Sequence, residues 1–123
     1  MGQARVLLIN DAHDHYWYEI LKAAIAPLGM LQIGLAEDIA QLARPGSFDL
    51  LIVDAAAVEN VPLLLGRLRA RQPDARIIVA TASPTWRRAR EAFQAGASDY
   101  IRKSLDLHEI RAALQNALET TLP

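Results

Sequence analysis

The amino-acid sequence predicts an α/β fold, a doubly wound five-stranded parallel sheet covered by helices on both faces. Its 123 residues are the size of one compact domain. The composition, 52% hydrophobic and 22% charged, is sufficient to bury a core. Short continuous apolar runs alternate along the chain with longer stretches of helical period, which is typical of buried parallel strands joined by helices.

Five short runs, mostly β-branched or leucine, are the candidate strands. Each is four to six residues long. They are Arg5–Ile9, Leu31–Leu35, Leu50–Val53, Arg76–Ala80 and Ser98–Ile101.

Apolar side chains at helical spacing predict a helix in each of the first three connections. The first ends at Pro27-Leu28-Gly29, and the second is a short helix from Glu37 to Ala43. The inner face of the third is Val61, Leu64, Leu65 and Leu68.

Two further helices follow the fourth and fifth candidate strands. Ser83-Pro84 is expected to cap the fourth, with the proline at its first helical position. Asp106 and Glu109 form a variant capping box for the last helix.

Five strand-helix units imply right-handed crossovers, for which the flavodoxin-like strand order 2-1-3-4-5 is a common solution. We expect residues 1–123 to form one domain. Ligand chemistry in such a sheet is located at the carboxyl ends of the strands.

Composition excludes several classes of function. The chain has no cysteine, which removes disulfides and thiolate metal sites, and its formal charge of −1 provides no general attraction to nucleic acid or to an anionic membrane. The N-terminal apolar run stops at Asn10-Asp11, too short for a signal sequence or a membrane span, so we expect a cytoplasmic protein.

Polar residues follow four of the candidate strands and should converge on one crevice. Asn10-Asp11 follow the first strand, Asp54 the third, Thr81 the fourth and Lys103 the fifth. In the order 2-1-3-4-5 these strands are contiguous, so the side chains meet at the switch point between strands one and three.

These residue types suit phosphoryl transfer. Asp54 follows a fully apolar strand, where an ionised carboxylate needs a partner or a cation. Asp54 with Asp11 would bind a hard cation such as Mg²⁺, and Thr81 and Lys103 would neutralise a phosphoryl group. Asp54 would then be the nucleophile that forms an acyl phosphate.

The chain resembles the receiver domain of two-component response regulators over essentially its whole length. The matching segments are RVLLIND, FDLLIVD, IIVATAS and AFQAGASDYIRK, in this order. The resemblance implies that Asp54 is the phospho-acceptor, that Asp11 binds Mg²⁺ and that Asn10 stands at the position of a second acid. It also implies that the Ala56 carbonyl binds the metal, that Thr81 and Lys103 contact the phosphoryl group, and that Tyr100 is an aromatic switch residue.

The resemblance further implies the partners. A sensor histidine kinase or a phosphotransfer protein would supply the phosphoryl group, and a downstream effector protein or domain would read it. The charge balance, not the resemblance, predicts no direct binding to nucleic acid or membrane. The protein would be a switch that modifies itself rather than a turnover enzyme. A homodimer would use the face of the fourth helix, fifth strand and fifth helix.

Three departures from the family pattern favour an alternative. Asn10 replaces an acid, Ser104 replaces the usual cis proline, so that the Lys103-Ser104 bond is expected to be trans, and the loop AAAVENVP lacks the usual proline and glycine. The alternative is a degenerate pseudo-receiver that binds proteins independently of phosphorylation. Sequence alone leaves open which of the two it is, and whether the chain acts alone or within a longer protein.

Other readings of the sequence rank lower. A flavodoxin-like cofactor enzyme needs a glycine- and hydroxyl-rich phosphate loop, whereas Asp11-Ala12-His13-Asp14 is acidic and glycine-free. His13 and His15 have the wrong spacing for a helical metal site. The aromatic run Tyr16–Tyr18 is expected to be partly buried beside the site.

Overall fold

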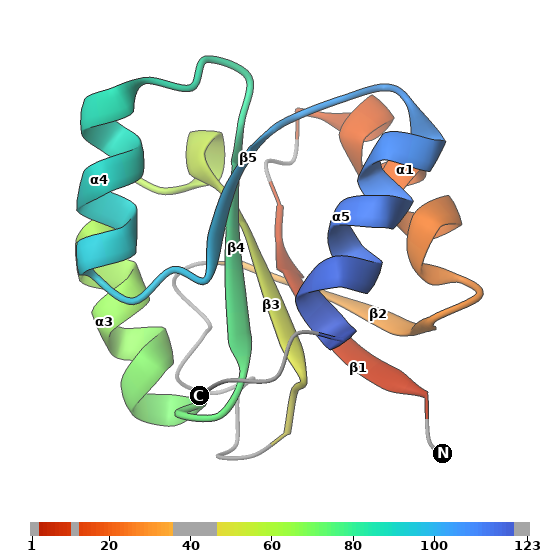
Figure 1. The fold of residues 1–123 in the computed structure, drawn as a ribbon, viewed down its shortest axis with the longest axis horizontal. Coiled ribbons are helices and arrows are strands. Elements are labelled where there is room, and N and C mark those ends of the chain that lie inside the picture. The colour runs from red at the N-terminus through yellow and green to blue at the C-terminus, as the bar shows by residue number, and fades with distance from the viewer. Residues whose placement is uncertain (1–2, 11–12, 36–46, 120–123) are drawn as a thin grey trace.

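The computed structural model describes residues 3–10, 13–35 and 47–119. A five-stranded parallel sheet in the order β2-β1-β3-β4-β5 forms its centre, which confirms the predicted topology. The carboxyl ends of the strands lie toward the top of Figure 1.

Each strand overlaps a run picked out from the sequence. The bounds are β1 Ala4–Ile9, β2 Gly29–Gly34, β3 Leu50–Asp54, β4 Arg76–Thr81 and β5 Asp99–Arg102. The central strand β3 is buried along its whole length, as expected of a strand covered on both faces.

Three helices and one short turn lie between the described strands, and a fourth helix follows β5. They are α1 His15–Ile25, the 3-10 turn η2 Ala55–Ala57, α3 Val61–Arg71, α4 Trp86–Gln94 and α5 Leu107–Glu119. None of the described helices combines the length and apolar character that a membrane crossing needs.

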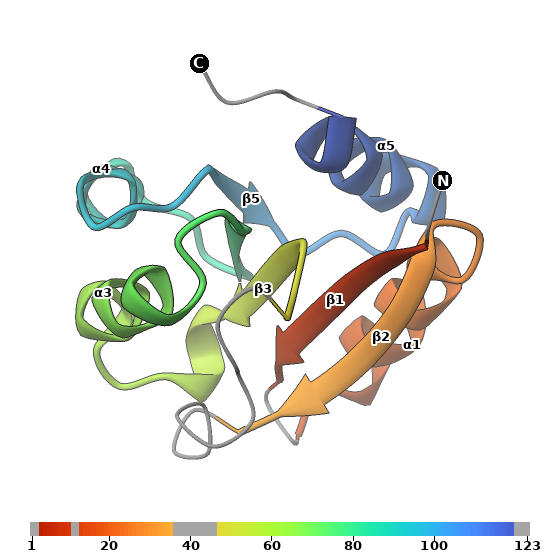
Figure 2. The ribbon, with the colours of Figure 1, turned by 90° about the horizontal axis from the view of Figure 1, so that it is seen from below.

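The helices divide between the two faces of the sheet, as Figure 2 shows. On one face, α1 and α5 cover a core that includes Trp17, Leu21 and Leu114. On the other, α3 and α4 cover a second core that includes Leu65 and Ala92. The alternate residues of β1, β3 and β4 enter opposite cores, so the centre of the sheet is held by apolar burial on both sides.

Two details of helix capping differ from the sequence prediction. The N-cap of α4 is Thr85, whose hydroxyl accepts from the Arg88 amide, so Ser83-Pro84 lies before the helix. Asp106 caps α5, accepting from the His108 and Glu109 amides, but Glu109 accepts from the Ser104 hydroxyl instead of closing a capping box. The predicted helix from Glu37 to Ala43 lies outside the described residues.

Two glycines, one at the edge of the sheet and one in a helix, differ in the space available for an added methyl group. A Cβ on Gly29, at the start of β2, would overlap the carbonyl of Ala4 on β1, whereas a Cβ on Gly66 in α3 would meet nothing within 4 Å. We expect Gly29→Ala to lower the free energy of unfolding by about 1–3 kcal/mol, since backbone must move to admit the methyl group. Gly66→Ala should raise it by about 0.5–1 kcal/mol through helix propensity.

Urea denaturation of both variants beside the wild type measures these changes. If Gly29→Ala were as stable as the wild type, β1 and β2 would not approach as closely as Ala4 and Gly29 do here.

Candidate functional site

Asp54 is the most deeply buried acid described, at 0% exposure. It is the last residue of β3, and the apolar residues before it fix its position at the carboxyl edge of the sheet. Its Oδ1 accepts from the Ala56 amide at 3.0 Å, in the turn η2 that the side chain caps. One hydrogen bond from a backbone amide balances little of the carboxylate's negative charge, so another group must balance the rest.

Lys103 supplies that balance from the segment after β5. Its ammonium lies 2.6 Å from Asp54 Oδ2, and it donates a hydrogen bond of 2.7 Å to Asp14 Oδ2. The Asp54 contact is an ion pair. One ammonium therefore joins two carboxylates that come from different parts of the chain.

The charges of this trio are mutually stabilised. Burial lowers the pKa of Lys103, but the hydrogen bond to Asp14 and the contacts with Asp54 outweigh burial and raise this pKa above its ordinary value. Burial raises the pKa of Asp14, but the bonds from Lys103 and the Trp17 amide outweigh it and leave this pKa lowered. Lys103 and Asp14 are therefore both charged at neutral pH.

Thr81 ends β4 beside this trio. Its carbonyl accepts from the Lys103 amide at 2.8 Å, which fixes the segment that carries the ammonium. Its buried hydroxyl accepts from the Ser83 amide at 3.2 Å. The hydroxyl retains its own hydrogen for donation to a group in the crevice.

Asn10 follows β1 next to Asp54. The residues before them, Ile9 and Val53, are register partners, and Asn10 Oδ1 is buried without a hydrogen-bond partner among the described residues. Asp11 lies outside the described residues, and those that are described contain no cluster of three acids or histidines suited to a metal ion. The carboxylate of Asp54 and the unpartnered amide oxygen of Asn10 are nevertheless the hard oxygen donors that Mg²⁺ takes.

Trp17 forms a wall of the site. It is fully buried in α1, and Lys103 Nζ lies 6.0 Å from the centre of its ring. The aromatic run is thus divided, since Tyr16 is 80% exposed.

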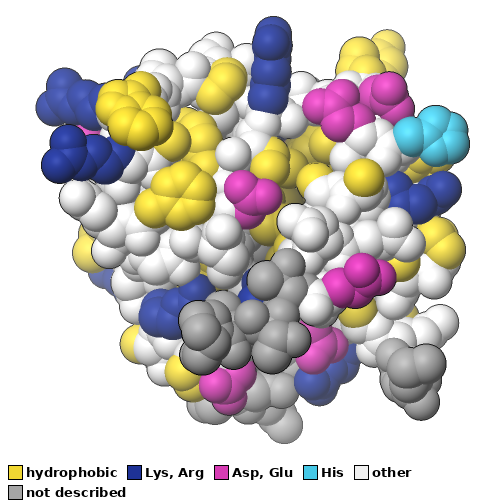
Figure 3. Space-filling view, viewed as in Figure 1, with side chains coloured by type: hydrophobic (Ala, Val, Ile, Leu, Met, Phe, Trp, Pro, Cys, Tyr) yellow, Lys and Arg dark blue, Asp and Glu magenta, His cyan; other side chains and the backbone are white. Residues whose placement is uncertain are grey.

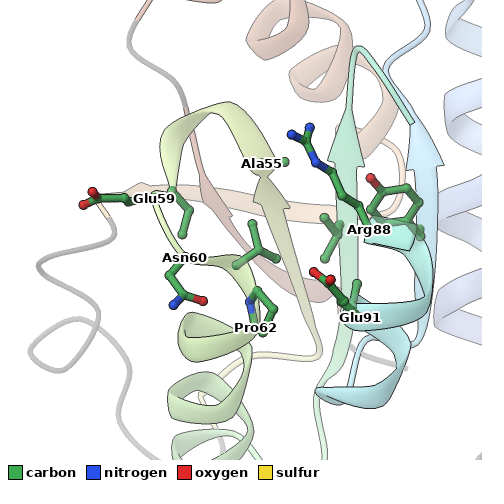
Figure 4. A pocket seen from close by; sticks show the side chains of 11 residues that line it. Ala55, Glu59, Asn60, Pro62, Arg88 and Glu91 are labelled. Atoms are coloured by element: carbon green, nitrogen blue, oxygen red, sulfur yellow. The ribbon is translucent and has the colours of Figure 1, made fainter. Parts of the chain in front are cut away.

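Tyr100 lies on the other face of the sheet from Trp17. It packs against the core under α3 and α4. It also lines a pocket of about 380 Å³ that lies between these two helices. Figure 4 shows Arg88 and Glu91 of α4 on one side of this pocket, with Asn60 and Pro62 at the start of α3 on the other. The pocket gives the tyrosine ring unfilled space beside it.

The surface of α4 is basic and aromatic. Trp86 is 85% exposed and Phe93 is also exposed, and the same helix carries Arg87, Arg88 and Arg90. Figure 3 shows dark-blue side chains beside a hydrophobic one in the upper left, where Figure 1 places the start of α4.

The structure therefore brings Asp54, Lys103 and Thr81 to one edge, and adds Asp14, which the sequence analysis did not assign to the site. Asp14 is the N-cap of α1, accepting from the Trp17 amide at 3.0 Å with its other oxygen. The only feature of the local sequence that explains an aspartate at position 14 is the start of a helix. A helix start does not predict a contact with Lys103.

The sequence is similar to curated response regulators. DNA-binding transcriptional regulator NtrC of Azospirillum brasilense is 32% identical over 126 residues, which cover 100% of this chain and 26% of that protein. Photosynthetic apparatus regulatory protein RegA of Cereibacter sphaeroides is 31% identical over 121 residues, covering 93% of this chain and 63% of that protein. The chain thus spans about a quarter of NtrC and less than two thirds of RegA.

Solved structures share the fold. A response regulator from Thermotoga maritima aligns with a TM-score of 0.82 at 21% identity, covering 96% of this chain and 99% of that one. A BeF3-activated DrrB receiver domain aligns with a TM-score of 0.81 at 18% identity, with the same coverage. The sequence itself matches the response regulator receiver domain over residues 6–115, and the chain belongs to that family.

Proposed function

We propose that the chain is a phosphorylatable receiver in which Asp54 accepts a phosphoryl group with the help of Mg²⁺. The observation that carries the proposal is the fully buried Asp54 carboxylate held 2.6 Å from the Lys103 ammonium. Burial removes water from the nucleophile, and the ammonium supplies positive charge where phosphoryl oxygens would lie. Residues 1–123 would act as one such domain.

The transfer forms one bond and breaks another. A carboxylate oxygen of Asp54 attacks the phosphorus of the donor, and the bond from phosphorus to the donor's oxygen or nitrogen breaks. The leaving group keeps the electron pair, as acetate from acetyl phosphate or as imidazole from phosphohistidine. Lys103 and the Thr81 hydroxyl would contact the oxygens of the transferred group.

Asp54, Asp11, Asn10 and the Ala56 carbonyl would hold the Mg²⁺, whose contribution is to neutralise charge on the phosphoryl oxygens. Support comes from the buried, unpartnered Asn10 Oδ1 beside the buried Asp54 carboxylate. Asn10 supplies a neutral ligand where a carboxylate would add a full charge.

Asn10→Asp should therefore tighten Mg²⁺ binding by about tenfold, since it adds one negative charge to a partly buried pocket. Trp17 reports on the titration by fluorescence, and replacing the exposed Trp86 with Phe leaves Trp17 as the sole tryptophan. Unchanged affinity would show that Asn10 does not contact the ion.

Phosphorylation would change partner binding through Thr81 and Tyr100. The pocket between α3 and α4 offers room for the Tyr100 ring to move, and the exposed Trp86 and Phe93 offer an adjoining surface. That surface, with β5 and α5, would also serve a homodimer. The donor would be a sensor histidine kinase or a phosphotransfer protein, and the reader an effector, in the cytoplasm and without direct contact with nucleic acid.

A pseudo-receiver that binds partners constitutively is the second candidate. The observation that favours it is the double pairing of Lys103, whose ammonium already contacts both Asp54 and Asp14. The trans backbone at Lys103-Ser104 agrees with expectation, since the described residues contain no cis peptide bond.

Intact-mass spectrometry after incubation with acetyl phosphate and Mg²⁺ decides between the two candidates. We expect one phosphoryl adduct on the wild type and none on Asp54→Ala. Asp99→Ala, at the start of β5, is the matched control and should keep the adduct. An unmodified wild type would leave the constitutive binding module as the function.

A further inference from the structure

Asp14 is an acid of the site that does not end a strand and has no role in the proposed phosphoryl transfer. It sits at the N-cap of α1, and 89 positions in sequence separate it from Lys103, to which it is joined by a 2.7 Å hydrogen bond. The contact is partly buried, with side-chain exposures of 11% for Lys103 and 29% for Asp14. A short charge-assisted bond in such a setting is among the stronger polar contacts in a protein.

The two oxygens of Asp14 have separate tasks. Oδ1 accepts from the Trp17 amide and caps the helix, while Oδ2 accepts from Lys103. The cap fixes the carboxylate in place, so its second oxygen faces the ammonium in a set direction. Asp14 therefore restrains Lys103 without depending on the flexibility of a long side chain.

A phosphoryl group on Asp54 would meet this restraint directly. Asp54 and Asp14 both lie within 2.7 Å of Lys103 Nζ, so a dianionic group bonded to Asp54 would share the ammonium with the Asp14 carboxylate. Like charges this close repel in a partly buried site. The unphosphorylated arrangement satisfies Lys103 with two anions, and the phosphorylated one must weaken the contact with Asp14.

We propose that Asp14 is a positioning residue that holds Lys103 in the unphosphorylated arrangement and opposes the arrival of a phosphoryl group. The inference rests on the proposed phosphoryl chemistry at Asp54. It assigns to the N-cap of α1 a second task, the setting of the equilibrium between the two states of the site.

Beryllofluoride, a phosphoryl mimic that binds an aspartate without a chemical step, measures that equilibrium. Titrations at saturating Mg²⁺, followed by Trp17 fluorescence in the Trp86→Phe background, should give a concentration for half-saturation about three- to tenfold lower for Asp14→Asn. Asp14→Ser should behave in the same way, because both Asn and Ser keep the N-cap while removing the charge. Asp106→Asn removes a charge from the cap of α5 and should leave the value unchanged, since the Asp106 carboxylate accepts from the His108 and Glu109 amides and contacts the Lys103 side chain in none of the interactions among the described residues.

A second readout follows Lys103 without any phosphoryl mimic. Lys22 and Lys103 are the only lysines of the chain, so ¹⁵N-lysine labelling gives one exposed and one partly buried ammonium. We expect the hydrogen-bonded Lys103 ammonium to be protected from exchange in the wild type and to lose protection in Asp14→Asn, with Lys22 unchanged. A purely structural cap would leave both signals as they are.

The outcomes separate this inference from the proposed function. A wild type that binds beryllofluoride, with equal or weaker binding by Asp14→Asn and Asp14→Ser, would overturn the role of Asp14 alone. A wild type that takes neither beryllofluoride nor acetyl phosphate would overturn both proposals.

Discussion

Lys103→Met should lower the free energy of unfolding by about 3–5 kcal/mol, because it leaves a carboxylate buried without its cation. Asp54 is 0% exposed, and after the substitution only the Ala56 amide would contact it among the described groups. Methionine matches the unbranched stem of lysine, so the loss would reflect charge more than packing. Urea denaturation at neutral pH measures it.

Two variants identify the source of this loss. Lys103→Met combined with Asp54→Asn should recover most of the stability, since the buried group is then neutral and can keep its bond from the Ala56 amide. Lys22→Met removes an exposed lysine and should change stability by no more than about 0.5 kcal/mol. Mg²⁺ should stabilise Lys103→Met more than the wild type, because the ion would replace the missing positive charge.

If Lys103→Met lost less than about 1 kcal/mol, water would have to reach the Asp54 carboxylate in the variant. The double variant would then show no recovery. That result would weaken the case that the pair is the electrostatic centre of the site.

The fold could be predicted because its signals are local. The three central strands β1, β3 and β4 each contain a continuous apolar run, and each described helix carries apolar residues that enter one of the two cores. The strand order followed from the chirality of the crossovers rather than from any one residue. Element ends were less certain, since at α4 the hydroxyls of Ser83 and Thr85 are both candidate caps and only the backbone path after Pro84 selects Thr85.

The site was predictable where its residues end strands. Asp54, Thr81 and Lys103 lie at one edge because parallel strands end together, and the confirmed sheet order makes those strands neighbours. Asp14 escaped prediction because it belongs to a helix start, where Asp has a sufficient local reason to occur. Its contact with Lys103 depends on the angle at which α1 leaves the sheet, which no short sequence pattern encodes.

The burial of Trp17 follows from the same geometry. The sequence predicted partial burial for the run Tyr16–Tyr18, yet Trp17 is fully buried and Tyr16 is exposed. The difference is one of helical phase, since neighbouring residues in a helix point about 100° apart. The buried ring then lies beside Lys103, which places an aromatic wall against the charged trio.

Arg69→Met is the second substitution expected to have a large effect, about 2–3 kcal/mol of lost stability. The guanidinium donates to the Ala75 and Gly96 carbonyls at 2.6 Å each, and to the Pro73 carbonyl at 3.2 Å. It joins the end of α3, the start of β4 and the turn after α4, where Gly96 has a φ of +114°. Burial lowers the pKa of Arg69, which nevertheless stays charged at neutral pH.

The planar, forked shape of the guanidinium explains why arginine is needed at this position. One nitrogen serves Pro73 and Ala75 while the other serves Gly96, so a single ammonium cannot reach all three carbonyls. We therefore expect Arg69→Lys to lose nearly as much stability as Arg69→Met.

The exposed Arg67 on the same helix is the matched control, and Arg67→Met should change stability by no more than about 0.5 kcal/mol. Equal stability of the Met and wild-type forms at position 69, in urea denaturation, would mean that water replaces the guanidinium at all three carbonyls. Because Arg69 lies at the opposite end of β4 from Thr81, a loss confined to stability, with phosphorylation of the folded protein intact, would separate the framework of the sheet from its chemistry.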